Sequence, residues 1–178
     1  MDTLSSSRIN TKTLVIAALF IALSYIGSYI KVFGSIAFDS FPGFLAALVL
    51  GPVYGAIIGF LGHLFTALTS GFPLSVPLHM VIAVSMAITM LVFGYTYKAL
   101  IKKASTASTL ILTGIIGIIL NGPVSLAFSM LALSFIAGIE AALGLLTLLP
   151  FLTIAAVINV VMSITVYKSL SGVWKKII

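Results

Sequence analysis

The spacing of the charged residues constrains this chain more than any other feature of its sequence. Residues 32–97 contain one formal charge, Asp39, and residues 104–167 contain one, Glu140. Because one transmembrane helix takes about 20 apolar residues, such stretches can cross a bilayer several times. Only 7% of the residues are charged and 61% are hydrophobic, whereas soluble domains carry roughly a quarter charged residues. We therefore expect an all-α integral membrane protein that forms one membrane domain, residues 1–178.

Breaker residues divide the chain into six apolar segments. The segments predicted to be helices are 13–30, 42–50, 53–69, 78–100, 109–129 and 148–170. The second is short, and Gly51-Pro52 after it marks a turn or a kink. Asn121-Gly122-Pro123 is expected to break the fifth helix. Residues 131–147 are only mildly apolar, which is compatible with an interfacial turn.

The positions of the basic residues decide between five helices and six. If residues 41–68 formed one kinked span, the basic cluster around Lys102 would lie opposite the N-terminal basic residues. With a turn at Gly51-Pro52, eight of the nine basic residues fall on one side and only Lys31 falls on the other. The eight are Arg8, Lys12, Lys98, Lys102, Lys103, Lys168, Lys175 and Lys176. Since cytoplasmic loops are rich in Lys and Arg, we expect six transmembrane helices with both termini cytoplasmic.

This topology also explains the net charge of +6. Lysines next to the membrane contact anionic lipid headgroups, so the charge does not require a nucleic-acid partner.

The sequence lacks the motifs of the common enzyme classes. It contains no phosphate-binding loop, no G-x-G-x-x-G, no H-E-x-x-H and no C-x-x-C, and no G-x-S-x-G nucleophile elbow. It has no Cys, and its acidic residues in or near the predicted membrane are Asp39 and Glu140. Two carboxylates make a poor proton relay. We therefore expect no enzymatic activity, no ATP hydrolysis by this chain alone and no cofactor.

The few polar residues of the predicted helices gather toward one side of the membrane. In the six-helix topology the extracellular connections are residues 31–40, 70–77 and about 130–147. The candidate substrate-binding residues on or near this side are Tyr29, Asp39, His63, His79, Asn121, Ser125 and Asn159. Each could instead join helices by hydrogen bonds or anchor an aromatic ring at the interface. As a set they indicate a ligand site in the outer half of the bundle.

A metal site is not expected from the two histidines. His63 and His79 are not spaced i, i+4, no Cys accompanies them, and Asp39 is the only nearby carboxylate. A transition-metal site usually has three or four convergent ligands.

Small residues recur at helical spacing in the first and third helices. The first helix carries A-x-x-x-A at Ala18 and Ala22, and the third begins with Gly51, Gly55 and Gly59. Such spacing lets another helix approach closely. Packing within the bundle is an equally simple explanation of the pattern.

With these features in this order, the whole chain resembles the substrate-binding S components of the energy-coupling factor (ECF) vitamin transporters. The likeness rests on size, on six helices with inner termini, on Ala18 and Ala22, and on the run Leu50-Gly-Pro-Val-Tyr-Gly-Ala-Ile-Ile-Gly59. It implies a bacterial cytoplasmic membrane protein whose helix-one alanines face a transmembrane coupling subunit, with two ATPase subunits supplying energy. It further implies a substrate held by the loops after helices one and three and by helices four to six.

The resemblance also bears on the substrate. The nickel and cobalt branch of the family uses an N-terminal histidine, whereas this chain begins Met1-Asp2-Thr3, so metal uptake is not favoured. Residues 38–44 and 62–73 look most like those of S components for cobalamin precursors such as α-ribazole. Two functions from other classes are the alternatives. One is a small-solute facilitator or channel that works without an ATPase, and the other is an assembly factor without a pocket.

Side-chain chemistry favours a neutral ligand as well. Lys31 is the only basic residue of the outer half, so a strongly anionic ligand such as a folate would bury carboxylates with few charged partners. Aromatic walls with a few placed polar groups suit a flat, neutral or weakly basic heterocycle. The aromatic residues near this side are Tyr25, Tyr29, Phe33, Phe38, Phe41, Phe72 and Phe135. Pantothenate, an anion that Lys31 would meet, is the alternative substrate.

Overall fold

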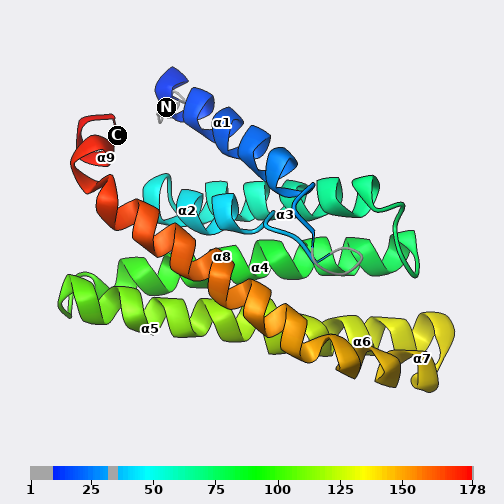
Figure 1. Cartoon of the computed structure of the whole chain (residues 1–178). Helices are drawn as coiled ribbons and strands as arrows, with labels where there is room; N and C mark the ends of the chain where they lie inside the picture. Colours follow the sequence, from blue (N-terminus) through cyan, green and yellow to red (C-terminus); the bar gives the residue numbers. More distant parts are fainter. Residues whose placement is uncertain (1–9, 32–35, 178) are drawn as a thin grey trace, which may run out of the picture.

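Helices make up most of the described part of the chain. The computed structural model describes residues 10–31 and 36–177, so Arg8 and Phe33 of the sequence analysis lie outside it. The elements are α1 (Thr11–Gly27), α2 (Phe41–Val49), α3 (Pro52–Thr69), α4 (Val76–Leu100), α5 (Thr106–Ile119), η1 (Leu120–Val124), α6 (Ser125–Ala137), α7 (Ile139–Gly144), η2 (Leu145–Leu148), α8 (Leu149–Ser169) and α9 (Ser171–Ile177) (Figure 1). Lys31 and Ala37 form an isolated antiparallel bridge between α1 and α2.

Polar side chains cap the N-termini of three helices. The side-chain oxygen of Asn10 accepts a hydrogen bond from the backbone N–H of Lys12 at the start of α1. Ser75 caps α4 and Ser105 caps α5 in the same way. Each cap satisfies one backbone donor that the first helical turn leaves unpaired.

The chain reverses direction at Gly51, as the Gly-Pro pair predicted. Gly51 has φ +106°, a conformation that glycine adopts at little cost. After the turn, α3 packs back along α2: a Cβ on Gly55 would lie 2.6 Å from the Cβ of Ala47, and one on Gly43 would lie 3.1 Å from the Cα of Gly59. The small residues of this hairpin therefore let two helices touch through their backbones.

Four helical stretches of the described chain are long and apolar enough to cross a membrane. They are Pro52–Thr69, Val76–Leu100, Thr106–Ala137 and Ile139–Ser169. The apolar helix α1 has 17 residues, and α2 has nine, about 13 Å at 1.5 Å per residue. Since the hydrocarbon core is about 30 Å thick, α2 is too short to cross it alone. The count of six spanning helices stays a prediction.

The α-helix is interrupted at Asn121-Gly122-Pro123, where residues 120–124 form one π-helical turn that contains Pro123. The chain does not turn there, and the helix continues to Ala137 rather than ending near Ser129. Proline lacks a backbone N–H and crowds the preceding turn. A π-turn widens the helix locally, and the chain keeps its direction.

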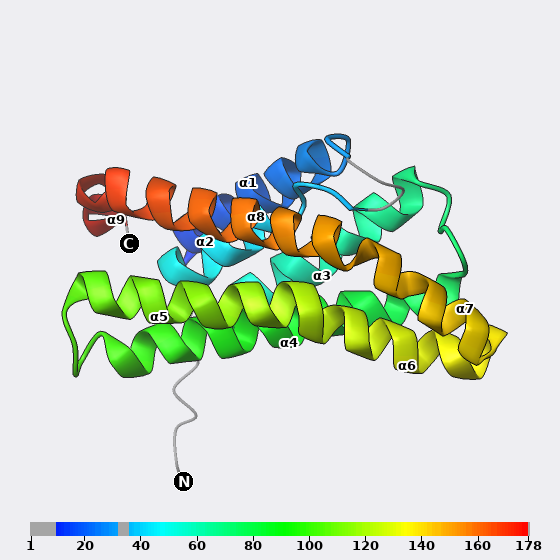
Figure 2. The same cartoon turned by 60° about the horizontal axis from the view of Figure 1, so that its bottom comes forward.

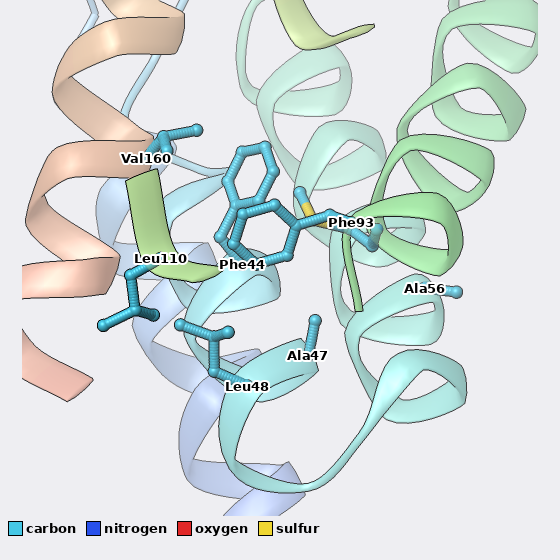
Figure 3. Close-up of a cluster of buried hydrophobic side chains, with 8 residues drawn as sticks. Phe44, Ala47, Leu48, Ala56, Phe93, Leu110 and Val160 are labelled. Atoms are coloured by element: carbon cyan, nitrogen blue, oxygen red, sulfur yellow. The ribbon is translucent and has the colours of Figure 1, made fainter. Parts of the chain in front are cut away.

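The bundle is organised around α4, with α8 crossing its neighbours obliquely (Figure 1). At its centre the rings of Phe44 from α2 and Phe93 from α4 meet edge to face, with centroids 4.8 Å apart (Figure 3). Leu110 of α5 and Val160 of α8 complete this buried cluster. Inside a membrane such packing replaces the hydrophobic effect as the force that holds helices together.

The two ends of the bundle differ in charge. The α4–α5 turn and α9 lie at one end, while α7 and the α3–α4 turn lie at the other (Figures 1 and 2). The first end carries Lys98, Lys102, Lys103, Lys168 and Lys176. Glu140 lies in α7 at the opposite end.

Candidate functional site

A cavity of about 340 Å³ lies between α3, α4, α6 and α8, and η2, which follows α7, also lines it. Its walls are mostly apolar and include Leu78, Ile82, Met86, Leu126 and Leu152. Six of the seven predicted substrate-binding residues line it: Asp39, His63, His79, Asn121, Ser125 and Asn159. Most of the polar residues grouped by sequence therefore meet around one space.

Asp39 is the only carboxylate among the described residues that line the cavity. It is 3% exposed, and two hydroxyls donate hydrogen bonds to it: Thr66 Oγ1 to Oδ2 at 2.6 Å and Ser40 Oγ to Oδ1 at 3.1 Å. Because a carboxylate has about four acceptor positions, Asp39 retains capacity for a ligand donor. The Ser24 hydroxyl of α1 donates to the backbone carbonyl of Asp39, which ties this segment to the first helix.

The two histidines are hydrogen-bonded to each other, and His79 is also hydrogen-bonded to the backbone of the α3–α4 loop. His63 Nε2 lies 3.1 Å from His79 Nδ1, and His79 Nε2 lies 2.9 Å from the backbone carbonyl of Pro73. Since a carbonyl only accepts, His79 Nε2 carries the proton. In neutral His79, Nδ1 then accepts from His63 Nε2. The remaining nitrogen, His63 Nδ1, faces Asp39 Oδ2 at 3.7 Å.

The hydrogen bonds of the two histidines connect α3, α4 and the loop between them. Phe72 of that loop packs edge-on against the His79 ring, with centroids 5.9 Å apart. Phe72 and Leu74 have φ values of +51° and +73°, which residues other than glycine rarely adopt. The contacts of His79 with Pro73 and Phe72 therefore hold a strained loop against the cavity.

Asn121 presents a buried acceptor without a donor. Its side-chain oxygen finds no hydrogen-bond partner among the described residues, and the residue is 5% exposed. The π-turn of η1 carries it into the cavity lining; such turns are frequent at functional sites. Because an unsatisfied buried polar group costs about 1–3 kcal/mol, a ligand N–H or O–H at this position would relieve that cost.

Tyr29 is the predicted residue that the structure does not bring to the cavity. It is 61% exposed and follows α1, where its hydroxyl lies 2.7 Å from that of Tyr25. This hydrogen bond raises the pKa of Tyr29 above its usual value. Of the other predicted aromatics, Phe72 contacts His79, Phe38 lines a separate apolar pocket, and Phe135 is 85% exposed.

Sequence reasoning missed Thr66, whose hydroxyl donates a hydrogen bond to Asp39. Thr66 lies three positions after His63, and residues at this spacing share one face of a helix. That spacing was the available signal, because both side chains reach the carboxylate of Asp39. The apolar wall from Leu145 to Leu152 was also missed, since its residues look like ordinary membrane-facing positions.

The described residues form no metal site, and the small-residue face of α1 is exposed. Within them, no group of three or more His, Cys, Asp or Glu is arranged to hold a metal ion. Ala18 and Ala22 are exposed on α1, while Ala17 and Phe20 face the bundle. The A-x-x-x-A surface is therefore open for a neighbour.

The helices are apolar and long enough to cross a membrane, and the cavity between them has mostly apolar walls with a few polar side chains. These features define a membrane-embedded protein with room for a small molecule. A family model described as "ECF transporter, substrate-specific component" matches residues 12–171. No curated protein and no solved structure matches the chain. The chain belongs to the ECF transporter substrate-specific component family.

Membership gives the coarse function. Members of the family are substrate-binding subunits of ECF importers and are transport subunits rather than enzymes. They associate with a transmembrane coupling component and with ATPases. This favours an importer subunit over the facilitator and the assembly factor considered from the sequence.

Proposed function

We propose that this S component binds α-ribazole, or a closely similar neutral benzimidazole riboside, for import toward cobalamin synthesis. The observation that carries the proposal is the charge of the cavity: among the described residues that line it, one is a carboxylate and none is Lys or Arg. Such a lining favours a neutral or weakly basic ligand. In the proposed topology six helices cross the cytoplasmic membrane of a bacterium, and the cavity lies in the outer half.

The two parts of a benzimidazole riboside match the two kinds of wall. A flat aromatic ring system gains from burial against apolar side chains such as Leu78, Ile82 and Met86. Ribose hydroxyls are donors, which suits the open acceptor of Asn121 and the carboxylate of Asp39. The cavity volume of about 340 Å³ lies within the range of small-molecule sites, about 300–1,000 Å³.

Pantothenate, the alternative substrate, is an anion, and the described lining of the cavity provides no Lys or Arg to pair with its carboxylate. Lys31, the cation that would have met it, pairs through its backbone with Ala37 and is not among the lining residues. A buried carboxylate would lie near Asp39 without a cation to compensate it, and burying an unpaired charge costs several kcal/mol. We therefore rank pantothenate second.

Isothermal titration calorimetry on the purified protein tests the proposal. We expect submicromolar binding of α-ribazole, and at least tenfold weaker binding in each of Asp39→Ala, His79→Ala and Asn121→Ala. Ser134→Ala is the matched control, since Ser134 lies on α6 outside the cavity and bonds only its own helix. Tight binding of pantothenate without α-ribazole would reverse the ranking, and tight binding of neither would leave the family assignment alone.

A further inference from the structure

A second hollow of about 300 Å³ follows the seam between α5 and α8, separate from the substrate cavity. On α5 its lining runs from Ala107 to Ile118, and on α8 from Val160 to Lys168. The side chains along it are apolar except for Thr165 and Lys168. Ile111 is 62% exposed and Ile115 is 49% exposed, so the groove opens toward the membrane.

The length of the groove matches one leaflet of a bilayer. From Ala107 to Ile118 there are eleven helical steps, about 16 Å at 1.5 Å each. That is roughly half of the 30 Å hydrocarbon core. An acyl chain that enters from the headgroup side of one leaflet would therefore lie along the groove to its end.

The charge is confined to one end of this groove. Lys168 lies in the last turn of α8 and lines the groove beside Ala107. Lys102 and Lys103 are exposed in the turn that leads into α5. The groove's basic end therefore carries up to three ammonium groups at the depth of the headgroups.

No carboxylate of the described chain neutralises this end. The described acidic residues are Asp39, which is buried at the substrate cavity, and Glu140, which lies in α7 at the other end of the bundle. Among the described residues, the one close approach of a basic nitrogen to a carboxylate is that of His63 to Asp39, inside the bundle. These lysines therefore have no negatively charged partner among the described residues, and the phosphate of a lipid headgroup would supply one.

We infer that the groove between α5 and α8 binds one anionic phospholipid. One acyl chain lies along the apolar seam from Ala107 to Ile118, and the headgroup phosphate meets the ammonium group of Lys168. Lysines bury their aliphatic stem along apolar surface and keep the charge at the interface, which places the Lys168 ammonium at the mouth of the groove.

Native mass spectrometry of the purified protein with added lipid tests this inference. The probes are phosphatidylglycerol and phosphatidylcholine with identical acyl chains. We expect one phosphatidylglycerol to stay bound, and its retention over phosphatidylcholine to fall at least fivefold in Lys168→Ala. Lys176→Ala is the matched control, because Lys176 is exposed at the same end on α9 and does not line the groove.

A second variant separates the groove from its charge. Ala107→Phe fills the mouth of the groove from an exposed position, so we expect it to lose the bound phosphatidylglycerol, with circular dichroism and the unfolding temperature reporting that the fold is intact. Equal losses in Lys168→Ala and Lys176→Ala would reduce the effect to diffuse attraction and overturn the inference. Undiminished retention of phosphatidylglycerol by Ala107→Phe would overturn it as well.

Discussion

The side-chain oxygen of Asn159 accepts a hydrogen bond of 2.8 Å from the backbone N–H of Phe41, a residue 118 positions away. The amide nitrogen of Asn159 donates to the carbonyl of Ala37 at 3.3 Å and to that of Ala155 at 2.9 Å. All three contacts are to backbone, so the amide fixes the segment from Ala37 to Phe41 against α8. Asn159 also lines the cavity, and we expect its main role to be the positioning of Asp39, which lies within that segment.

Removal of this amide should therefore weaken both stability and binding. Asn159→Ala leaves the Phe41 N–H and the Ala37 carbonyl without their partner, and each buried unsatisfied group costs about 1–3 kcal/mol. We expect a lower unfolding temperature in detergent and a ligand affinity reduced at least fivefold. Thr153→Ala, on the same helix, is the control, because the Thr153 hydroxyl bonds only the carbonyl of Leu149. An unchanged melting curve for Asn159→Ala would contradict this role.

The hydrogen bond between Thr66 and Asp39 makes a second prediction. Thr66→Val keeps the side-chain shape and removes the 2.6 Å bond to the buried carboxylate. Hydrogen bonds to charged groups contribute about 1.5–3 kcal/mol, so we expect a clear fall in unfolding temperature and weaker binding of the ligand.

Thr69→Val serves as the matched control for Thr66→Val. The Thr69 hydroxyl lies one turn further along α3 and donates only to carbonyls of its own helix. Its removal should shift the unfolding temperature little. The same shift in both variants would mean that the carboxylate contact contributes nothing specific.

Much of the fold could be predicted because the sequence separates its helices clearly. Gly51-Pro52 marks a reversal of the chain, and Gly51 adopts the positive φ that this turn requires. The spacing of Gly and Ala on either side is typical of closely packed helices, as found in the hairpin of α2 and α3. The interruption at Asn121-Gly122-Pro123 was predicted in the right place, but the helix continues beyond it, because this signal does not distinguish a turn from a π-bulge. The segment packs against both α8 and α4, which keeps the helix in line through the proline.

The candidate site was accessible from sequence for a different reason. Polar side chains are scarce in an apolar chain, so their positions are informative even without a motif. Tyr29 was predicted to bind substrate, yet it is exposed and does not line the cavity. Tyrosine is also common at the membrane interface, and the sequence does not separate the two roles. Thr66 was overlooked because threonine on a membrane helix commonly bonds its own backbone, and nothing in the sequence shows that Asp39 lies beside it.

The charge at the two ends of the bundle supports the proposed six-helix topology and makes it testable. Ala104 lies in the lysine-bearing α4–α5 turn, and Thr147 lies at the end near α7; both are exposed. In this Cys-free chain, Thr147→Cys should react with an impermeant maleimide from outside intact cells. Ala104→Cys should react only after permeabilisation, since basic connections stay in the cytoplasm. Equal labelling of both from outside would exclude the six-helix topology.

Docking on the coupling subunit is expected at Ala18 and Ala22. Both are exposed on α1, so Trp at either position meets no neighbour within the bundle, yet it prevents another helix from approaching closely. Leu131→Trp, at a 58% exposed position on α6, is the matched control for added bulk. We expect Ala18→Trp and Ala22→Trp to keep ligand affinity in calorimetry while co-purification with the coupling subunit and uptake by the assembled importer fall at least tenfold. Normal uptake by both variants would place the interface on another face of the bundle, whereas loss of ligand binding would show that α1 supports the cavity instead.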